Sequence, residues 1–261
     1  MAYAQQLAVE KAWQSSQIPT QSMVLQAWAP QDLKQVDALT VYIEGDGLAW
    51  LSLDHPSDDP SPTHPVGLQL ALGDPSQTAV YLARPCQYLS EAQRATMCIP
   101  ADWLDGRFSP RLLRAMSEAL DALKQRHGAK QLVLIGYSGG AAMAALLASR
   151  RQDISTLITV AGNLDHRAWT SHHRLTPLIG SLNPADDIAT LARVPQYHLV
   201  GDRDVNITPD MVRTYAAKFP QEHRPVVVLV TGFDHQCCWS VHWPQLWQSI
   251  MRGGASVDAT Q

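Results

Sequence analysis

Residues 131–151 read QLVLIGYSGGAAMAALLASRR, and this segment decides the expected fold. The apolar run 132–135 predicts a strand buried on both faces, and the small residues 141–149 predict a helix directly after it. Between them Ser138 lies in a G-x-S-x-G turn. Such a turn between a strand and a helix holds a serine in a strained backbone conformation, with its hydroxyl above the sheet near a helix N-terminus. The segment therefore predicts a nucleophilic serine.

A glycine-rich turn between a strand and a helix can also bind a phosphate or a dinucleotide. That alternative is disfavoured because the glycine spacing is not G-x-G-x-x-G and no P-loop lysine follows Gly140. The letters G-x-S-x-G alone occur by chance in roughly one chain in ten. The position of the motif between a strand and a helix is what favours the nucleophile.

Strands and helices alternate along the rest of the chain, which predicts an α/β fold with a mostly parallel, doubly wound sheet. We expect one domain over residues 1–261, in which the polar segment 162–195 forms a small cap. The other expected strands are residues 22–29, 39–43, 79–82, 157–160, 197–200 and 226–230. The other expected helices are residues 2–15, 66–72, 110–127, 208–218 and 243–251.

Composition excludes several classes of function. The 261 residues are 46% hydrophobic and carry a net charge of −4 without a basic run, so no nucleic-acid partner is expected. No apolar run approaches the roughly 20 residues that a transmembrane helix needs. The N-terminus lacks the charged start and apolar centre of a signal peptide, so we expect a cytosolic chain or a processed form.

Two further strand ends supply partners for a serine nucleophile. A serine hydroxyl needs a base to take its proton, and that base needs a third group to hold its tautomer. Asp204 follows the strand 197–200 and His235 follows the strand 226–230. The chain order Ser138, Asp204, His235 is the order found on an α/β-hydrolase sheet, so these residues are the predicted catalytic triad. Asp202 is the alternative acid, but its position directly after a glycine favours a turn.

The loop after residue 43 is expected to help stabilise negative charge on the substrate. One backbone N–H donor is expected from Gly139 and the second from Asp46, with Gly47 as the runner-up. The carboxylates of Glu44 and Asp46 would oppose such charge if unpaired. We therefore expect Arg84 to pair with Glu44 or Asp46, the alternative being that both acids are solvated.

No metal or cofactor is expected. His166, His172 and His173 fall in one segment but lack the spacing of a metal site.

The chain has four cysteines. Cys86 and Cys98 could form a disulfide or remain two buried thiols, and both outcomes are equally open from the sequence. The adjacent residues 237 and 238 are expected to be free thiols, because a ring between neighbouring cysteines would be strained.

Five segments of the chain match one known family: YIEGDG (42–47), ARPCQY (83–88), GYSGG (136–140), AGNLDH (161–166) and GFDHQCCW (232–239). Through these segments the chain resembles the α/β-hydrolase superfamily over about residues 22–251. More narrowly it resembles a set of largely uncharacterised bacterial α/β hydrolases often described as lipoproteins. The resemblance implies a triad of Ser138, Asp204 and His235, although Glu44 stands where a histidine often precedes the oxyanion glycine. The narrower group implies export to the periplasm, which would favour the disulfide, although the lipobox cysteine is absent.

The predicted function is a serine hydrolase that cleaves a carboxylic ester or a related small acyl compound. A thioesterase or a peptidase could use the same triad, and a binding or scaffold module could retain the fold without catalysis. Tyr137, Asn163 and Trp169 are expected near the triad or the substrate. The sequence does not predict an oligomeric state. Three more tryptophans could line the pocket or pack in the core, namely Trp50, Trp103 and Trp239.

Overall fold

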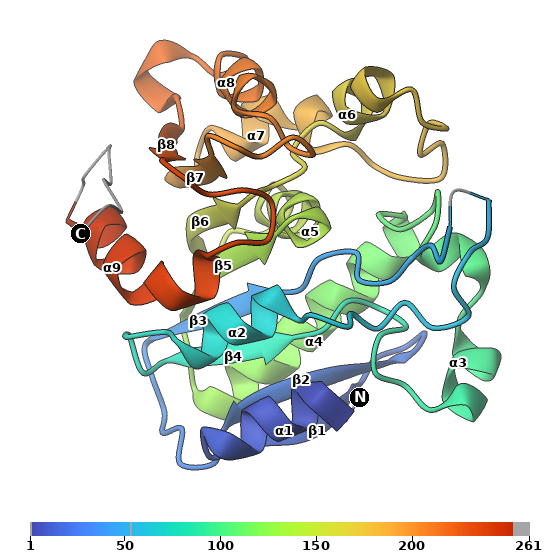
Figure 1. The fold of residues 1–261 in the computed structure, drawn as a ribbon. Coiled ribbons are helices and arrows are strands. Elements are labelled where there is room, and N and C mark those ends of the chain that lie inside the picture. The colour runs from blue at the N-terminus through green and yellow to red at the C-terminus, as the bar shows by residue number, and fades with distance from the viewer. Residues whose placement is uncertain (1, 53, 253–261) are drawn as a thin grey trace.

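The computed structural model describes residues 2–52 and 54–252; residues 1, 53 and 253–261 of the expected domain lie outside the described residues. In the described part, the strands form one eight-stranded sheet in the order β1-β2-β4-β3-β5-β6-β7-β8 (Figure 1). The strands are β1 (Trp13–Pro19), β2 (Val24–Pro30), β3 (Ala38–Ile43), β4 (Ala79–Leu82), β5 (Gln131–Tyr137), β6 (Ile154–Val160), β7 (Gln196–Gly201) and β8 (Val226–Val230).

The sheet is mostly parallel, which confirms the predicted fold class. The strands from β4 through β3, β5, β6 and β7 to β8 pair in parallel, whereas β2 pairs antiparallel with both β1 and β4. The prediction of one helix over residues 2–15 is wrong at its end. The helix ends at Glu10, Ala12 has a φ of 56°, and Trp13 begins β1.

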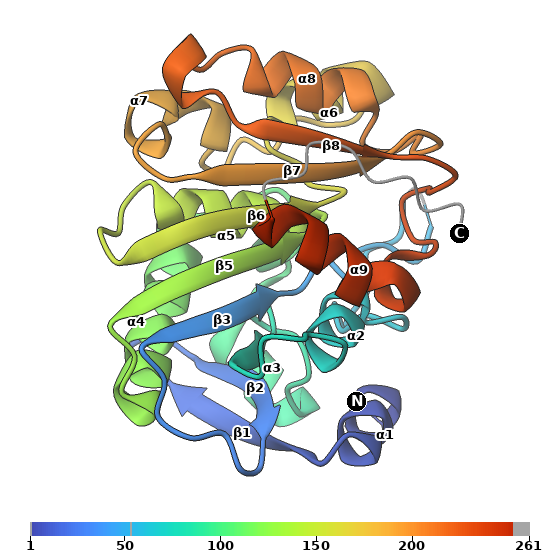
Figure 2. The same ribbon diagram turned by 90° about the vertical axis from the view of Figure 1, so that its left-hand side faces the viewer.

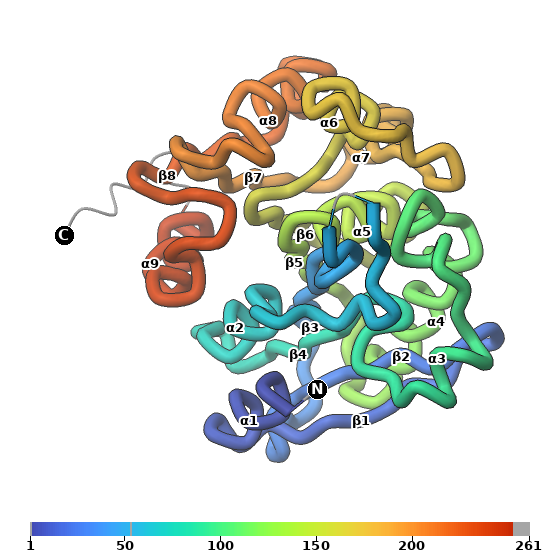
Figure 3. The backbone as a smooth tube through the Cα atoms, turned by 45° about the vertical axis from the view of Figure 1, so that its right-hand side comes forward, coloured from blue at the N-terminus to red at the C-terminus, as the bar shows by residue number. Residues whose placement is uncertain are grey.

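Helices cover both faces of this sheet, as a parallel sheet requires. In Figures 2 and 3, α1, α2 and α9 lie over one face while α4 and α5 lie over the opposite one. The helices are α1 (Ala2–Glu10), α2 (Val66–Leu72), α3 (Glu91–Met97), α4 (Pro110–His127), α5 (Gly139–Ala148), α6 (His166–His173), α7 (Ile188–Leu191), α8 (Pro209–Ala216) and α9 (Trp239–Met251). Short 3₁₀ segments span Pro100–Asp102, Pro184–Asp186 and Gln221–His223.

Helix α4 illustrates how the sequence forms these elements. The hydroxyl of Ser109 accepts a hydrogen bond from the backbone of Leu112, and proline at the first helical position suits the helix start. Gly128 ends the helix in the left-handed conformation, with φ of 66°. The apolar side of the helix, which includes Met116 and Leu120, is fully buried against the sheet.

The segment between β6 and β7, expected to act as a cap, contains α6, the 3₁₀ segment Pro184–Asp186 and α7. Two interactions hold α6 in place. The Asp165 side chain accepts from the backbone of Ala168 and caps the helix, and Lys218 of the segment after α8 forms an ion pair with Asp165 at 2.5 Å. These contacts position α6 beside the loop that follows β7.

All four cysteines lie in the described residues, and none of them is free there. A disulfide joins Cys86 and Cys98. Both cysteines pack with Trp103 in a small buried cluster. The prediction of free thiols at Cys237 and Cys238 is wrong, because these neighbours also form a disulfide. The prediction rested on the strain of a ring between neighbouring cysteines; the peptide bond between these two residues is cis.

Candidate active site

The turn between β5 and α5 places Ser138 at the carboxyl edge of the sheet. Ser138 has φ of 51° and ψ of −119°, a conformation that non-glycine residues rarely adopt. The two motif glycines are required by close packing. A Cβ atom at Gly136 would overlap the backbone of Ala141, and one at Gly140 would overlap the backbone of Glu44. The tight turn thus fixes the serine where its hydroxyl can meet the loops after β7 and β8.

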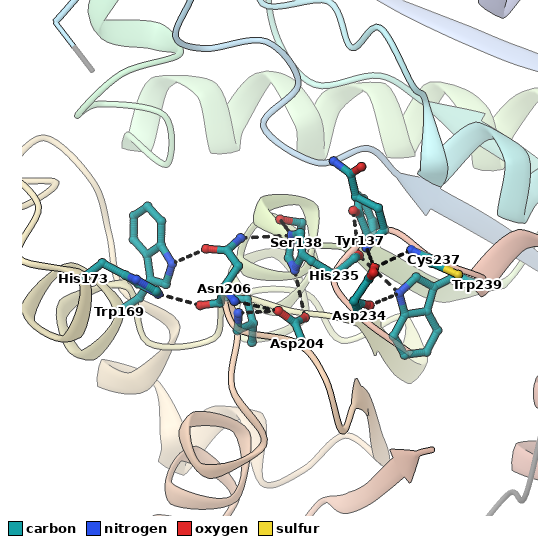
Figure 4. Close-up of polar contacts among 12 residues, drawn as sticks. Tyr137, Ser138, Trp169, His173, Asp204, Asn206, Asp234, His235, Cys237 and Trp239 are labelled. Atoms are coloured by element: carbon teal, nitrogen blue, oxygen red, sulfur yellow. Dashed lines mark hydrogen bonds and ion pairs between the residues drawn. The ribbon is translucent and has the colours of Figure 1, made fainter. Parts of the chain in front are cut away.

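The side chains of Ser138, His235 and Asp204 form a hydrogen-bonded chain (Figure 4). The Oγ of Ser138 lies 3.0 Å from the Nε2 of His235, and the Nδ1 of His235 lies 2.9 Å from the Oδ2 of Asp204. The other carboxylate oxygen of Asp204 accepts from the backbone of Asn206 and Ile207, at 2.9 and 2.8 Å. The carboxylate of Asp204 is fully buried, and both of its oxygens have hydrogen-bond partners, one in His235 and the other in the backbone of this loop.

The alternative acid, Asp202, serves the turn instead. Its Oδ1 accepts from the backbone N–H of Gly232 at 2.7 Å, so it ties the loop after β7 to the loop after β8. Asp234, next to the histidine, accepts from the backbone of Gln236 and Cys237. These two N–H groups lower the pKa of Asp234. The hydrogen bonds of both acids go to backbone N–H groups, whereas the imidazole of His235 bonds to Asp204.

The backbone carbonyl of His235 is held from two sides. The hydroxyl of Tyr137 donates to it at 3.0 Å, and the indole Nε1 of Trp239 donates to it at 3.2 Å (Figure 4). Burial raises the pKa of Tyr137, so this phenol stays a donor. Tyr137 therefore holds the loop that carries His235.

Asp46 lies against Gly139, the residue after the serine, and two arginines hold its carboxylate. Arg84 Nη1 lies 3.2 Å from Oδ1, and Arg107 Nη1 lies 2.6 Å from Oδ2. Burial by itself would raise the pKa of Asp46, but the guanidinium groups of Arg107 and Arg84 outweigh burial and lower it. The charge of this carboxylate, which lies beside the expected oxyanion donors, is thus neutralised by two guanidinium groups. Of the two partners predicted for Arg84, the structure selects Asp46.

Glu44 is neither solvated nor paired with an arginine. It is buried, and its carboxylate accepts from the backbone N–H groups of Gly45, Gly67 and Leu68 and from the hydroxyl of Tyr81. Burial raises the pKa of Glu44, and these donors act against that effect. The N–H of Gly45 already donates to the carboxylate of Glu44. A substrate oxygen would therefore have to bond to the N–H groups of the next residues in this loop.

The Asp46→Asn variant is expected to lower the free energy of unfolding by about 3 kcal/mol at pH 7, since it leaves two buried guanidinium groups without a counter-charge. The folded-state pKa of Asp46 lies below the unfolded value of about 3.9. The contribution of ionised Asp46 to the free energy of unfolding is therefore complete above about pH 4 and is lost as the pH falls through the folded-state pKa. Urea unfolding of both proteins from pH 7 to pH 2 should show the difference closing in acid.

Asp37→Asn is the matched control for that measurement. Asp37 also forms an ion pair, with Lys130 at 3.1 Å, but both side chains are more than 80% exposed. Removing an exposed pair should change the free energy of unfolding by less than about 0.5 kcal/mol. Equal losses in the two variants, or a difference that persists unchanged at pH 2, would contradict the account of Asp46.

A cavity of about 420 Å³ opens above Ser138 and His235. Asn163, Trp169 and Trp50 reach its wall, whereas Trp103 and Trp239 are buried away from it. The wall also includes polar groups from the loop after β3 and Arg107. The cavity is thus large enough for a small organic molecule and mixes apolar and polar surface.

The three histidines of the cap segment are used in packing and hydrogen bonds. The Nε2 of His166 lies 3.1 Å from the carbonyl of Leu182, and His172 packs edge-on against His173. The Nε2 of His173 lies 2.7 Å from the carbonyl of Asn206. In residues 2–52 and 54–252, one group of three potential metal ligands is close together, and it contains the disulfide-bonded Cys86 and Cys98.

Sequence reasoning missed two residues at this site. Arg107 comes from the loop before α4 and gives no local signal, because its partner lies 61 residues earlier in the chain. Asn206 lies two residues after Asp204, and its side-chain amide reaches the Nε2 of His235 at 3.1 Å. Its position in the loop after β7, close to the predicted acid, was the available signal.

No protein-family model matches the sequence, and the comparison with curated proteins finds no match either. Solved structures do resemble it. A structure of an alpha-beta serine hydrolase homologue from Coxiella burnetii has a TM-score of 0.60 and 15% identity, covering 92% of this chain and 96% of that one. Est1E from Butyrivibrio proteoclasticus, with ferulic acid bound, has a TM-score of 0.67 and 11% identity, covering 91% and 98%.

An esterase domain from a Rhodothermus marinus protein gives a TM-score of 0.60 at 12% identity, covering 93% of this chain and 98% of that one. Identities this low speak to the fold and not to the reaction. The sheet order, the turn at Ser138 and these similarities agree. The chain has the α/β-hydrolase fold.

Proposed function

We propose that the protein is a serine hydrolase that cleaves a carboxylic ester or a related acyl compound through an acyl-enzyme. The observation that supports this most is the hydrogen-bonded chain from Ser138 through His235 to the buried carboxylate of Asp204. A serine, a base and an orienting acid in this geometry can activate a hydroxyl for attack on a carbonyl carbon. The strained turn at Ser138 is a further argument, because a binding module has no need of it.

In the proposed first step, Ser138 Oγ forms a bond to the acyl carbon while its proton passes to the Nε2 of His235. The carbonyl π electrons move to the oxygen and give a tetrahedral oxyanion. When that oxyanion collapses, the bond to the leaving group breaks and His235 returns the proton to the departing oxygen. Water then repeats the sequence on the acyl-enzyme and releases the acid. Asp204 holds Nδ1 protonated throughout, so that Nε2 faces the serine.

The proposed oxyanion hole consists of the backbone N–H groups of Gly139 and Asp46, with Gly47 as the alternative second donor. Gly139 lies at the N-terminus of α5, where N–H groups lack partners within the helix. The arginines on the Asp46 carboxylate keep that side chain from repelling the oxyanion. No cofactor enters this scheme.

Asn163 and Trp169 are proposed to contact the substrate, because both line the cavity above the serine. A thioesterase or peptidase activity of the same site differs only in the leaving group, and cavity shape decides among these. Incubation with acetate esters, thioesters and anilides that share one acyl group should separate them. We expect a burst of alcohol release equal to the enzyme concentration, with one acetyl group on Ser138 in the intact-protein mass. A folded protein that turns over none of the three and gains no acetyl mass would overturn the proposal in favour of a binding module.

We further infer an oxidising compartment, such as the bacterial periplasm suggested by the narrower resemblance, with a cytoplasmic location as the alternative. Both disulfides support this, since disulfides persist mainly where the environment is oxidising. In the described residues, no helix is both long enough and apolar enough to cross a membrane.

A further inference from the structure

Asn206 connects the cap segment to the histidine of the site. It lies between β7 and α8, and its Oδ1 accepts from the indole Nε1 of Trp169 at 3.0 Å. Its Nδ2 lies 3.1 Å from the Nε2 of His235, the same nitrogen that faces Ser138 (Figure 4). One side chain thus contacts both α6 and the catalytic base of the proposed mechanism.

The indole of Trp169 determines which end of the amide faces the histidine. An indole N–H is a donor only, so it requires the oxygen of Asn206 and not the nitrogen. With Oδ1 committed to Trp169, the NH₂ group must point toward His235. The orientation of this amide therefore follows from its partner's chemistry.

An NH₂ group facing Nε2 selects one form of the imidazole. Nδ1 donates to the carboxylate of Asp204, so the neutral ring has its lone pair on Nε2. That lone pair accepts from Ser138 and from Asn206. A protonated Nε2 would instead set its own N–H against the N–H of Asn206, which is unfavourable.

We propose that Asn206 is a positioning residue that holds the Nε2 of His235 unprotonated and aimed at Ser138, with Trp169 fixing the direction of its amide. The inference rests on the proposed function. Helix α6, which contributes Trp169 to the cavity wall, would then have a second role in positioning His235. Trp169 and His173 lie one turn apart on α6. The indole of Trp169 bonds to the side chain of Asn206, and the imidazole of His173 bonds to the backbone carbonyl of Asn206. Through this double contact, α6 holds both the amide and the backbone of Asn206 in place beside His235.

Other ionisable groups also surround His235, and the test must leave them in place. Asp204 bonds to Nδ1, Asp234 is its neighbour in the chain, and the ring of Tyr137 packs at 5.6 Å. On α6, His173 reaches Asn206. The groups on the cavity wall are Glu44, Asp46, His64 and Arg107.

Asn206→Asp is the first test. The aspartate keeps an acceptor for Trp169 but turns an acceptor toward His235, which favours the imidazolium. The acidic limb of the kcat/KM profile should move to higher pH by about one unit or more, the effect of an opposite charge in contact. Gln236→Glu is the matched control, because it adds the same charge on the cavity wall at an exposed position without a bond to Nε2. It should move the limb by less than about 0.3 unit.

Trp169→Phe is the second test, since it removes the N–H that fixes the amide and retains an aromatic ring. The freed amide can turn its oxygen to His235, so the acidic limb should again move to higher pH, by less than in Asn206→Asp. In an Asn206→Leu background the same Trp169→Phe change should have no further effect on the limb. Additive shifts in that cycle would overturn the proposal.

The titration of the His235 imidazole, followed by NMR, separates this proposal from the proposed function. If wild type neither hydrolyses esters nor reacts with a fluorophosphonate, the hydrolase proposal fails, and the NMR midpoint of Asn206→Asp against wild type still tests the contact. If wild type is active but the midpoint and the acidic limb are unmoved in both variants, the role of Asn206 is refuted. Should Asn206→Asp fail to fold, Trp169→Phe decides by the same two measurements.

Discussion

Replacing Ser138 with alanine is expected to lower kcat for ester hydrolysis by roughly 10⁴- to 10⁶-fold, because no other group in the turn can form the acyl-enzyme. The variant should keep its fold. Removing one hydroxyl takes away the bond to His235 and no packing contact of the sheet, so the thermal unfolding midpoint should change by no more than a few degrees.

The matched control for that loss is Ser155→Ala. Ser155 lies on β6, and its hydroxyl donates to the backbone of Leu132 at 3.1 Å, on the neighbouring strand β5. Its removal should leave kcat within about twofold of wild type. A Ser138→Ala protein that is folded and retains more than about a tenth of the wild-type kcat would mean that the hydrolysis does not proceed through this serine.

Asp204→Asn is expected to lower kcat by about 10⁴-fold. The asparagine can still accept from the backbone of Asn206 and Ile207 through its oxygen. Its NH₂ group would then face Nδ1 of His235, which forces Nδ1 to accept and moves the ring proton to Nε2. The base would present a proton to Ser138 instead of a lone pair. Steady-state kinetics on one ester, measured over pH 5 to 9, would show the loss at every pH.

Asp202→Asn separates the two candidate acids. It makes the same change in charge two residues away, but Asp202 contacts the backbone of Gly232 and not the histidine. Its kcat should stay within about fivefold of wild type, with any loss appearing in stability. If Asp202→Asn were the more damaging variant, the assignment of the acid to Asp204 would be wrong.

The sheet could be predicted because its central strands are apolar runs bounded by turn residues. The edge strand β1 could not, because only Trp13 and Ile18 of its residues are buried and the rest face solvent. Helix α3 has no buried residue and therefore no apolar periodicity. Its capping box at Ser90 and Gln93 was the one local signal that could have indicated it.

Some residues of the candidate site could likewise be predicted from the sequence and others could not. Ser138, Asp204 and His235 each follow a strand, and strand ends meet at one edge of a parallel sheet, so their proximity could be anticipated. The ion pair of Arg107 with Asp46 joins loops 61 residues apart and depends on packing that no local pattern encodes. The same holds for the contact from Asn206 to His235, because the amide that makes it also accepts from Trp169 of α6, 37 residues earlier in the chain.

Fluorophosphonate labelling, mapped by mass spectrometry of peptides, tests the central claim of a histidine-activated serine most directly. Wild type should carry the phosphonate on Ser138, and His235→Ala should label at least about 10³-fold more slowly while remaining folded. Labelling of another residue, or an equal rate in His235→Ala, would contradict the claim that His235 activates Ser138.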